Sequence, residues 1–214
     1  MKTLLEKNKE WVQRVEQEQP GFFERLSQQH APELLWIGCS DARVPANQIV
    51  GLLPGALFVH RNIANMVVHT DLNCLSVVHF AVDTLKVKYL IVCGHYGCGG
   101  VRASLEELRP GLVFHWLRHI TDVREKHAEL LSRAKDHEAR VDLLCELNVA
   151  EQVRNLCRTS TLEDAWNSGS ELTVYGLIYN IRDGLLQDLD LTVTGKGKCE
   201  AVYESFLERM RSKV

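Results

Sequence analysis

The sequence predicts an α/β fold with a mainly parallel β-sheet that is flanked by helices and preceded by a helical arm. Two compact apolar runs, Leu34–Cys39 and Tyr89–Cys93, are typical of strands that are buried on both faces. Segments with apolar residues at helical spacing lie between and after these runs. Because strands that alternate with helices indicate a parallel sheet, the chain is expected to form one.

The other elements follow from the same kind of pattern. A short strand is expected at Ala56–Val59, and Asp71 is expected to cap a helix that continues to about Val87. A mainly helical stretch in several pieces follows Gly100. The chain is then expected to form strands at Leu172–Tyr179 and Leu189–Val193 and a last helix at Glu200–Met210.

The N-terminal part is expected to be a helical arm, residues 1–30, of a single domain that spans residues 1–214. Apolar residues such as Leu4, Leu5 and Trp11 recur at helical spacing with charged residues between them, which predicts an amphipathic helix. A second short helix is expected at Phe22–Gln28. An amphipathic helix needs an apolar surface to cover, and the sequence leaves open whether that surface belongs to the same chain.

The charge and the cysteine content of the chain bear on its possible partners and on its location. The 214 residues carry a formal net charge of -3 and an estimated pI of about 6.3, which gives no reason to expect a nucleic-acid or membrane-surface partner. The first residues are charged throughout and have no apolar core of the kind that a signal peptide has, so a cytoplasmic protein is expected. In that setting the seven cysteines are expected to be reduced thiols.

Metal-binding residue types follow the two apolar runs. Cys39 ends the first run, and His95 and Cys98 follow the second in a glycine-rich loop. The carboxyl ends of parallel strands meet at one edge of a sheet, so these three side chains are expected to converge. Two thiolates and one imidazole suit tetrahedral Zn²⁺, and three protein ligands leave a position for water. Cys39 taken alone would more often be a core thiol.

The motifs around these residues resemble those of the β-class carbonic anhydrases. The pattern of that family is Cys-x-Asp-x-Arg followed by His-x-x-Cys, and this chain has CSDAR at 39–43 and HYGCGG at 95–100. The resemblance continues through HRNIAN at 60–65 and DLNCLS at 71–76, and it reaches Asn180. Tyr96 stands where many members carry a small residue, and the sequence does not indicate its role.

The resemblance implies reversible hydration of CO₂ to bicarbonate and a proton by a hydroxide on one Zn²⁺ per chain. Carbonic anhydrase is the standard example of zinc-acidified water, in a three-histidine site. The resemblance also makes Asp41 and Arg43 catalytic: the carboxylate orients the nucleophile, and the guanidinium holds the carboxylate by a two-pronged hydrogen bond. Without the neighbouring Cys39, the pair would be read as an ordinary salt bridge in a loop.

A finer resemblance concerns regulation in a bacterial type of the family. Trp36, Arg61 and Tyr179 match the residues with which some bacterial members bind bicarbonate at a noncatalytic pocket. In those members the counterpart of Asp41 can move onto zinc, which would make bicarbonate and low pH inhibitory. The alternative is that Trp36 and Tyr179 are packed aromatic residues of the core.

The family also implies homodimers that pair into a dimer of dimers. Three other functions stay open at this point: a thiol redox or sulfur-transfer enzyme that uses Cys39 or Cys98 as a nucleophile, a non-catalytic zinc module with Asp41 as the fourth ligand, and a hydrolase of a CO₂ analogue such as carbon disulfide.

Overall fold

The computed structural model describes residues 1–28, 31–106 and 111–213, and the chain divides into two compact units, Met1–Ala31 and Pro32–Val214. The first unit holds α1 (Lys2–Glu18) and α2 (Phe22–Gln28), as the sequence predicts. The ring of Trp11 packs edge-on against Phe23 with the ring centroids 5.3 Å apart. None of the side chains of α1 is fully buried, and Leu4 and Leu5 of its apolar face are 65% and 64% exposed.

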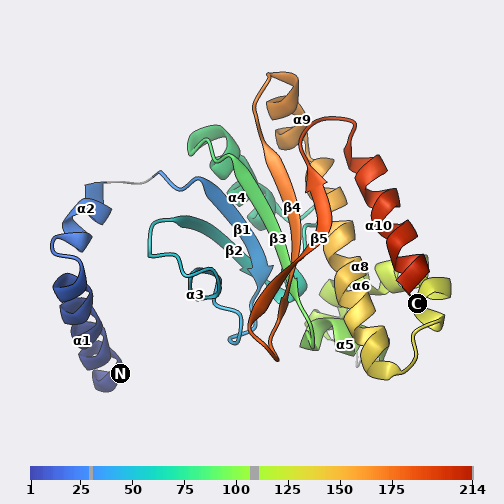
Figure 1. The fold of residues 1–214 in the computed structure, drawn as a ribbon, viewed down its shortest axis with the longest axis horizontal. Helices are drawn as coiled ribbons and strands as arrows, with labels where there is room; N and C mark the ends of the chain where they lie inside the picture. The colour runs from blue at the N-terminus through green and yellow to red at the C-terminus, as the bar shows by residue number, and fades with distance from the viewer. Residues whose placement is uncertain (29–30, 107–110, 214) are drawn as a thin grey trace. The chain divides into compact units, whose positions relative to one another are not determined.

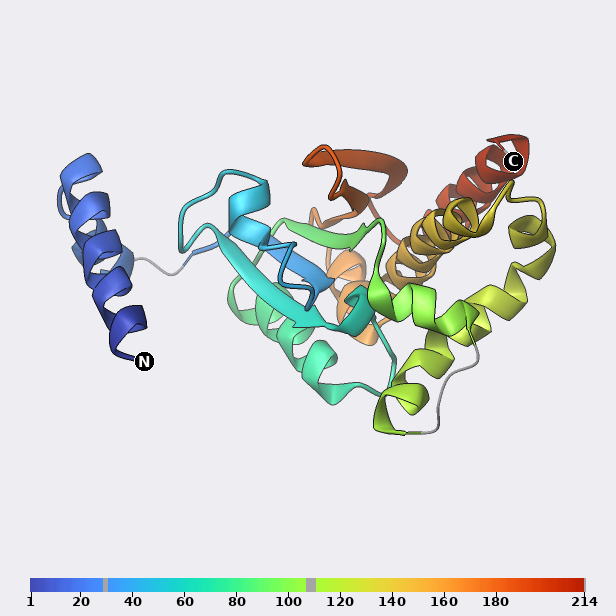
Figure 2. The same cartoon turned by 90° about the horizontal axis from the view of Figure 1, so that it is seen from below.

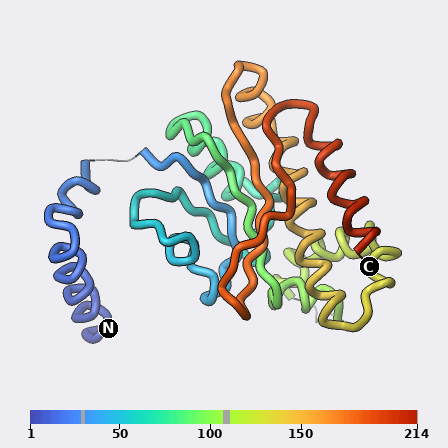
Figure 3. Tube along the Cα trace, viewed as in Figure 1, coloured from blue at the N-terminus to red at the C-terminus, as the bar shows by residue number. Residues whose placement is uncertain are grey.

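The second unit is built on a five-stranded sheet with the spatial order β2-β1-β3-β4-β5 (Figures 1 and 3). β1 pairs in parallel with β2 and β3, β3 pairs in parallel with β4, and β4 pairs antiparallel with β5. The expected mainly parallel sheet is therefore confirmed. The strands are β1 (Leu34–Cys39), β2 (Leu57–Asn62), β3 (Tyr89–His95), β4 (Thr173–Asn180) and β5 (Leu185–Val193).

The two faces of the sheet are covered differently. Along β1, Leu35 and Ile37 join the main hydrophobic core, whereas Trp36 joins a smaller cluster with Ile91 and Cys93 on the other face. Both sets are buried, which explains why this strand is apolar at every position.

Most helices pack on the main-core face. α8 contacts β3, β4 and β5, and α10 lies beside α8 and β5 (Figures 1 and 2). The helical elements of this unit are α3 (Ala46–Ile49), a 3₁₀ turn (Ile63–Asn65), α4 (Leu72–His79), a π-helical turn (Phe80–Thr84), α5 (Gly99–Leu105), α6 (Leu112–Lys126), α7 (Ala128–Ser132), α8 (His137–Cys157), α9 (Ser160–Asn167) and α10 (Cys199–Lys213). None of the described helices is long and apolar enough to cross a membrane.

Some boundaries differ from the sequence-based expectation. β2 continues to Asn62 because its polar end still pairs with β1, and β5 begins at Leu185 because its exposed first half pairs with β4 in a hairpin. The apolar pattern cannot show either extension, because the added residues of β2 are polar and those of β5 are largely exposed. The expected helix after Asp71 is capped by that side chain, and it changes to the π-helical turn after His79.

Candidate metal centre

Cys39, His95 and Cys98 converge at the carboxyl edge of the sheet. Cys39 is the last residue of β1, His95 is the last residue of β3, and Cys98 precedes the first turn of α5. Gly97, in the turn between the last two, has a φ of 66°, a conformation that glycine adopts without strain. The three ligand atoms all lie within 4.8 Å of one another, and all three residues are buried.

The geometry of this cluster fits a metal ion. The two Sγ atoms are 3.9 Å apart. His95 Nδ1 lies 3.0 Å from the carbonyl oxygen of Tyr96, which places the ring proton on Nδ1 and leaves the lone pair on Nε2. His95 Nε2 is itself buried and has no hydrogen-bond partner within the described chain. A buried imidazole nitrogen that faces two thiols is the arrangement that a zinc ion completes.

The two thiols are electrostatically unequal. A hydrogen bond from Cys98 lowers the pKa of the Cys39 thiol well below its ordinary value, and the interaction with Cys39 raises the pKa of Cys98. The backbone N–H of Ala64 also donates to Cys39 Sγ at 3.4 Å. The pair is thus disposed to share one proton, which a metal ion would displace when it binds both thiolates.

Asp41 and Arg43 lie beside the cluster and form a two-pronged pair. Arg43 Nε donates to Asp41 Oδ1 at 2.9 Å, and Arg43 Nη2 donates to Asp41 Oδ2 at 2.7 Å. These bonds lower the pKa of the Asp41 carboxyl far below its ordinary value. Asp41 Oδ2 is also 3.8 Å from His95 Nε2, so the carboxylate is turned toward Arg43 while it borders the metal position.

The three residues expected to bind bicarbonate have different surroundings. Arg61 is paired with Gly38 in the sheet, and its guanidinium donates to the carbonyl oxygens of Cys39 at 2.7 Å and of Asp41 at 2.5 Å. Trp36 is buried, and the partly buried Tyr179 packs against the same smaller core cluster. Trp36 and Tyr179 therefore share one face of the sheet.

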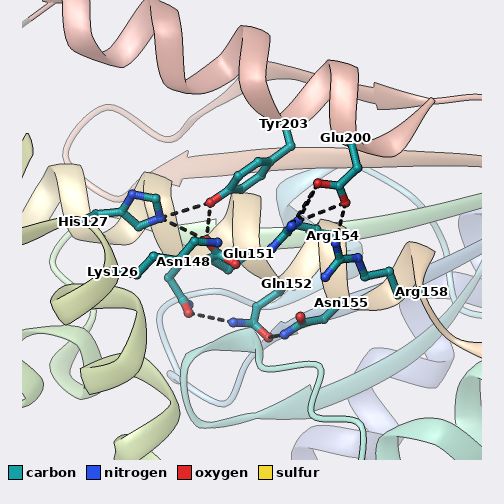
Figure 4. Close-up of polar contacts among 10 residues, drawn as sticks. All are labelled: Lys126, His127, Asn148, Glu151, Gln152, Arg154, Asn155, Arg158, Glu200 and Tyr203. Carbon is teal, nitrogen blue, oxygen red and sulfur yellow. Dashed lines mark hydrogen bonds and ion pairs between the residues drawn. The ribbon is translucent and has the colours of Figure 1, made fainter. Parts of the chain in front are cut away.

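A row of amides on α8 fixes the segment that follows β2. Within this segment Ala64 and Asn65 have positive φ angles of 64° and 49°. Asn148 Nδ2 donates to the Ala64 carbonyl at 3.0 Å, and Gln152 Oε1 accepts from the backbone N–H of Val67 at 2.8 Å. Figure 4 shows Asn148, Gln152 and Asn155 in this row. These bonds hold a strained backbone segment in place. One N–H group of this segment, that of Ala64, donates to Cys39 Sγ.

Tyr96 links the metal centre to the same helix. Its hydroxyl donates to Glu146 Oε1 at 2.6 Å, and its carbonyl oxygen accepts from the ring of His95. Lys213 Nζ lies 3.3 Å from the same carboxylate oxygen. Burial, followed by the hydrogen bond to Glu146, raises the pKa of Tyr96, so the hydroxyl stays a donor. Tyr96 and Glu146 also line a cavity of about 660 Å³.

Asn148, Gln152 and Glu146 support the site but are not among the residues that the sequence motifs indicate. A signal for them exists: they are polar residues within α8, a helix that is otherwise mostly buried and apolar, and all three are themselves buried. A buried polar side chain needs a partner, and these partners lie near the metal ligands.

The geometry can be compared with known proteins. The family model described as carbonic anhydrase matches residues 34–186 of this chain. The chain belongs to the carbonic anhydrases of the β class. The class follows from the fold, because the structure of a tetrameric β-carbonic anhydrase from Sordaria macrospora superposes with a TM-score of 0.86, at 38% identity over 90% of this chain and 98% of that one. A Coccomyxa β-carbonic anhydrase in complex with acetazolamide gives a TM-score of 0.89, at 34% identity over 98% of this chain and 97% of that one.

Among curated relatives, a carbonic anhydrase from Emericella nidulans is 44% identical over 192 residues, which cover 90% of this chain and 84% of the relative. A carbonic anhydrase from Pseudomonas aeruginosa is 34% identical over 179 residues, which cover 78% of each protein. The expectation of a bacterial type is therefore corrected, because the fungal relative is more similar than the bacterial one. Motifs of a few residues could not separate these groups, since the metal-site strings are too short to record lineage.

As a carbonic anhydrase, the chain is an enzyme of CO₂ hydration, and its Cys39, His95 and Cys98 cluster is consistent with the zinc site of the β class. The paired thiols and the unpartnered His95 Nε2 fit one zinc ion. The three side chains that were expected as zinc ligands therefore lie together, as their positions at or just after the ends of parallel strands predict.

Proposed function

We propose that this enzyme hydrates CO₂ with Asp41 and Arg43 as a catalytic pair next to a zinc ion held by Cys39, His95 and Cys98. The observation that carries the proposal is the two-pronged contact between Arg43 and a carboxylate that borders the metal position. Zinc, when bound, acidifies a water molecule and so supplies the nucleophile. Orientation of the nucleophile is the task of the Asp41 side chain, and Arg43 holds that side chain in place.

Asp41 is placed to accept a hydrogen bond from the nucleophile and to orient its lone pair toward CO₂. A depressed pKa keeps the carboxylate ionised, so it accepts and does not donate. Arg43 fixes both oxygens of the carboxylate, which removes the freedom of Asp41 to turn onto the metal.

The proposal includes regulation by bicarbonate at a noncatalytic pocket formed by Trp36, Arg61 and Tyr179. Support comes from Arg61, whose guanidinium donates to the backbone carbonyl of Asp41. An anion that drew this guanidinium away would free the Asp41 loop. Asp41 could then leave Arg43 and move onto zinc, and low pH would add to the inhibition.

Titration of CO₂ hydration against bicarbonate in the wild-type enzyme and in Trp36→Phe tests this regulation. Phenylalanine keeps the aromatic packing of the smaller core cluster but removes the indole N–H. The wild type is expected to lose activity as bicarbonate rises, and the variant is expected to resist this loss. Equal inhibition of both proteins would show that the pocket is not used.

We also propose that the chain forms a homodimer that can pair into a tetramer, and that it is located in the cytoplasm. The apolar face of α1 is largely exposed at Leu4, by 65%, which supports a homodimer in which this helix covers a partner chain, and the Sordaria macrospora relatives are tetrameric. Light scattering should therefore give a dimer or tetramer that Leu4→Glu weakens. Seven free cysteines support a reducing, cytoplasmic compartment.

A further inference from the structure

Two cysteines outside the metal centre lie at the neighbouring ends of α8 and α10, which pack against each other. Cys157 is the last residue of α8, and Cys199 is the first residue of α10. Cys157 is buried, and the partly buried Cys199 packs against the core cluster to which Cys157 belongs. The mechanism of CO₂ hydration gives neither thiol a task.

Two ion pairs that share the carboxylate of Glu200 hold this junction together. Arg154 Nη2 donates to Glu200 Oε2 at 2.9 Å, and Arg158 Nη2 donates to Glu200 Oε1 at 2.8 Å (Figure 4). Arg158 follows Cys157 in the chain, and Glu200 follows Cys199. The neighbours of the two cysteines are therefore fixed to each other, which keeps the thiols on facing helix ends.

The thiols interact and have unequal acidities. The hydrogen bond with the Cys157 thiol lowers the pKa of Cys199 against the opposing effects of burial and the Glu200 charge, while Cys199 raises the pKa of Cys157. Cys199 also stands at a helix N-terminus and is the more exposed of the two. A partly exposed, acidic thiol next to a second thiol is the usual environment of a redox-sensitive cysteine pair.

We propose that Cys157 and Cys199 are a reversible oxidation site that forms a disulfide when the protein meets a hydroperoxide. The Cys199 thiolate attacks the peroxide, so that an S–O bond forms, the O–O bond breaks and an alcohol or water leaves. The Cys157 sulfur then attacks the sulfenic acid, so that the S–S bond forms and water leaves with the Cys157 proton. Two thiols are oxidised by two electrons, and one hydroperoxide is reduced.

The disulfide would join α10 covalently to α8, the helix that supports the metal centre through Asn148 and Glu146. Because it closes a long loop of chain, the cross-link should stabilise the folded state. The zinc ligands are not part of the exchange. Oxidation would therefore change the thermal stability of the enzyme and not its metal content.

The test treats zinc-loaded protein with hydrogen peroxide, alkylates the remaining thiols and identifies the peptides by mass spectrometry. We expect a cross-linked peptide that joins Cys157 to Cys199, that disappears after reduction with dithiothreitol and that is absent from Cys199→Ser. The melting temperature of the oxidised wild type should rise by several degrees above that of the reduced protein. Cys199→Ser should show no such rise, and Cys74→Ala, which removes a buried cysteine outside the pair, should behave as the wild type.

Some results would overturn the proposal. One is full alkylation of both cysteines after peroxide treatment that oxidises a control dithiol peptide. Another is over-oxidation of Cys199 to a sulfinic acid while Cys157 stays free. A third is a disulfide between Cys199 residues of two chains, which a non-reducing gel would show.

Discussion

The Arg43 guanidinium holds both oxygens of the Asp41 carboxylate, through Nε to Oδ1 at 2.9 Å and Nη2 to Oδ2 at 2.7 Å. The carboxylate is thereby kept ionised and bonded to Arg43, while Oδ2 lies only 3.8 Å from His95 Nε2. In the function proposed above, this contact would keep Asp41 off a zinc ion held by Cys39, His95 and Cys98.

Replacement of Asp41 by Asn should keep zinc bound and remove most of the activity. The amide has a similar shape but lacks the charge that orients the nucleophile, so we expect kcat for CO₂ hydration to fall about a hundredfold or more. Stopped-flow kinetics and elemental analysis of the same sample give the two readouts. Loss of the metal in this variant would show that Asp41 is a structural ligand.

Tyr96→Phe should weaken zinc binding although Tyr96 is not a ligand. The change removes the hydroxyl that donates to Glu146 and so loosens the carbonyl that orients the His95 ring. Loss of a group that supports a metal ligand lowers metal affinity by roughly 10- to 100-fold. Competition with a chelator measures the zinc affinity. Glu146→Gln keeps an acceptor for the hydroxyl and should bind zinc nearly as the wild type does, and an equal loss in both variants would contradict this role.

Asn148→Ala should destabilise the fold by about 1–3 kcal/mol, because it leaves the buried carbonyl of Ala64 without its side-chain donor. Urea unfolding measures the free energy. Asn47→Ala is the matched control, since its amide also donates to a backbone carbonyl, that of Leu53, but at an exposed place. An equally small loss in the free energy of unfolding of both variants would show that the bond from Asn148 to Ala64 contributes no more than an exposed one.

Glu151 should make stability depend on acidic pH. Burial raises the pKa of this carboxyl, but hydrogen bonds from His127, Lys126 and Tyr203 outweigh burial and lower the pKa from 4.5 to about 2 (Figure 4). The folded-state pKa lies below the unfolded value, so the carboxylate stabilises the fold above about pH 4.5, and this contribution is lost as the pH falls toward 2.

Glu151→Gln tests this dependence. The difference in melting temperature between the wild type and the variant should be largest above pH 5 and should shrink below pH 4. Zinc loss in acid affects both proteins. The difference between their melting temperatures therefore reports the contribution of the Glu151 carboxylate alone. A difference that stays constant with pH would mean that Glu151 contributes through packing alone.

The sequence predicts those parts of the fold and of the site that depend on the pattern of residues close together in the chain. The all-apolar runs that end at Cys39 and Cys93 identify buried strands, and the ligand types after them identify the zinc cluster, because strand ends share an edge. The start of β5 at Leu185 could not be predicted, since its exposed residues form a strand only by pairing with β4. Asn148 and Gln152 stand out only as polar residues of a mostly apolar helix, and their partners could not be predicted because they lie more than 80 residues away in the chain.

Zinc-dependent CO₂ hydration by this chain is tested by stopped-flow kinetics on protein with a measured zinc content, with His95→Ala as the control. We expect one zinc per chain, rapid hydration in the wild type, and loss of both metal and activity in the variant. A wild-type protein that carries one zinc per chain but hydrates CO₂ no faster than buffer, or that hydrolyses carbon disulfide instead, would contradict it.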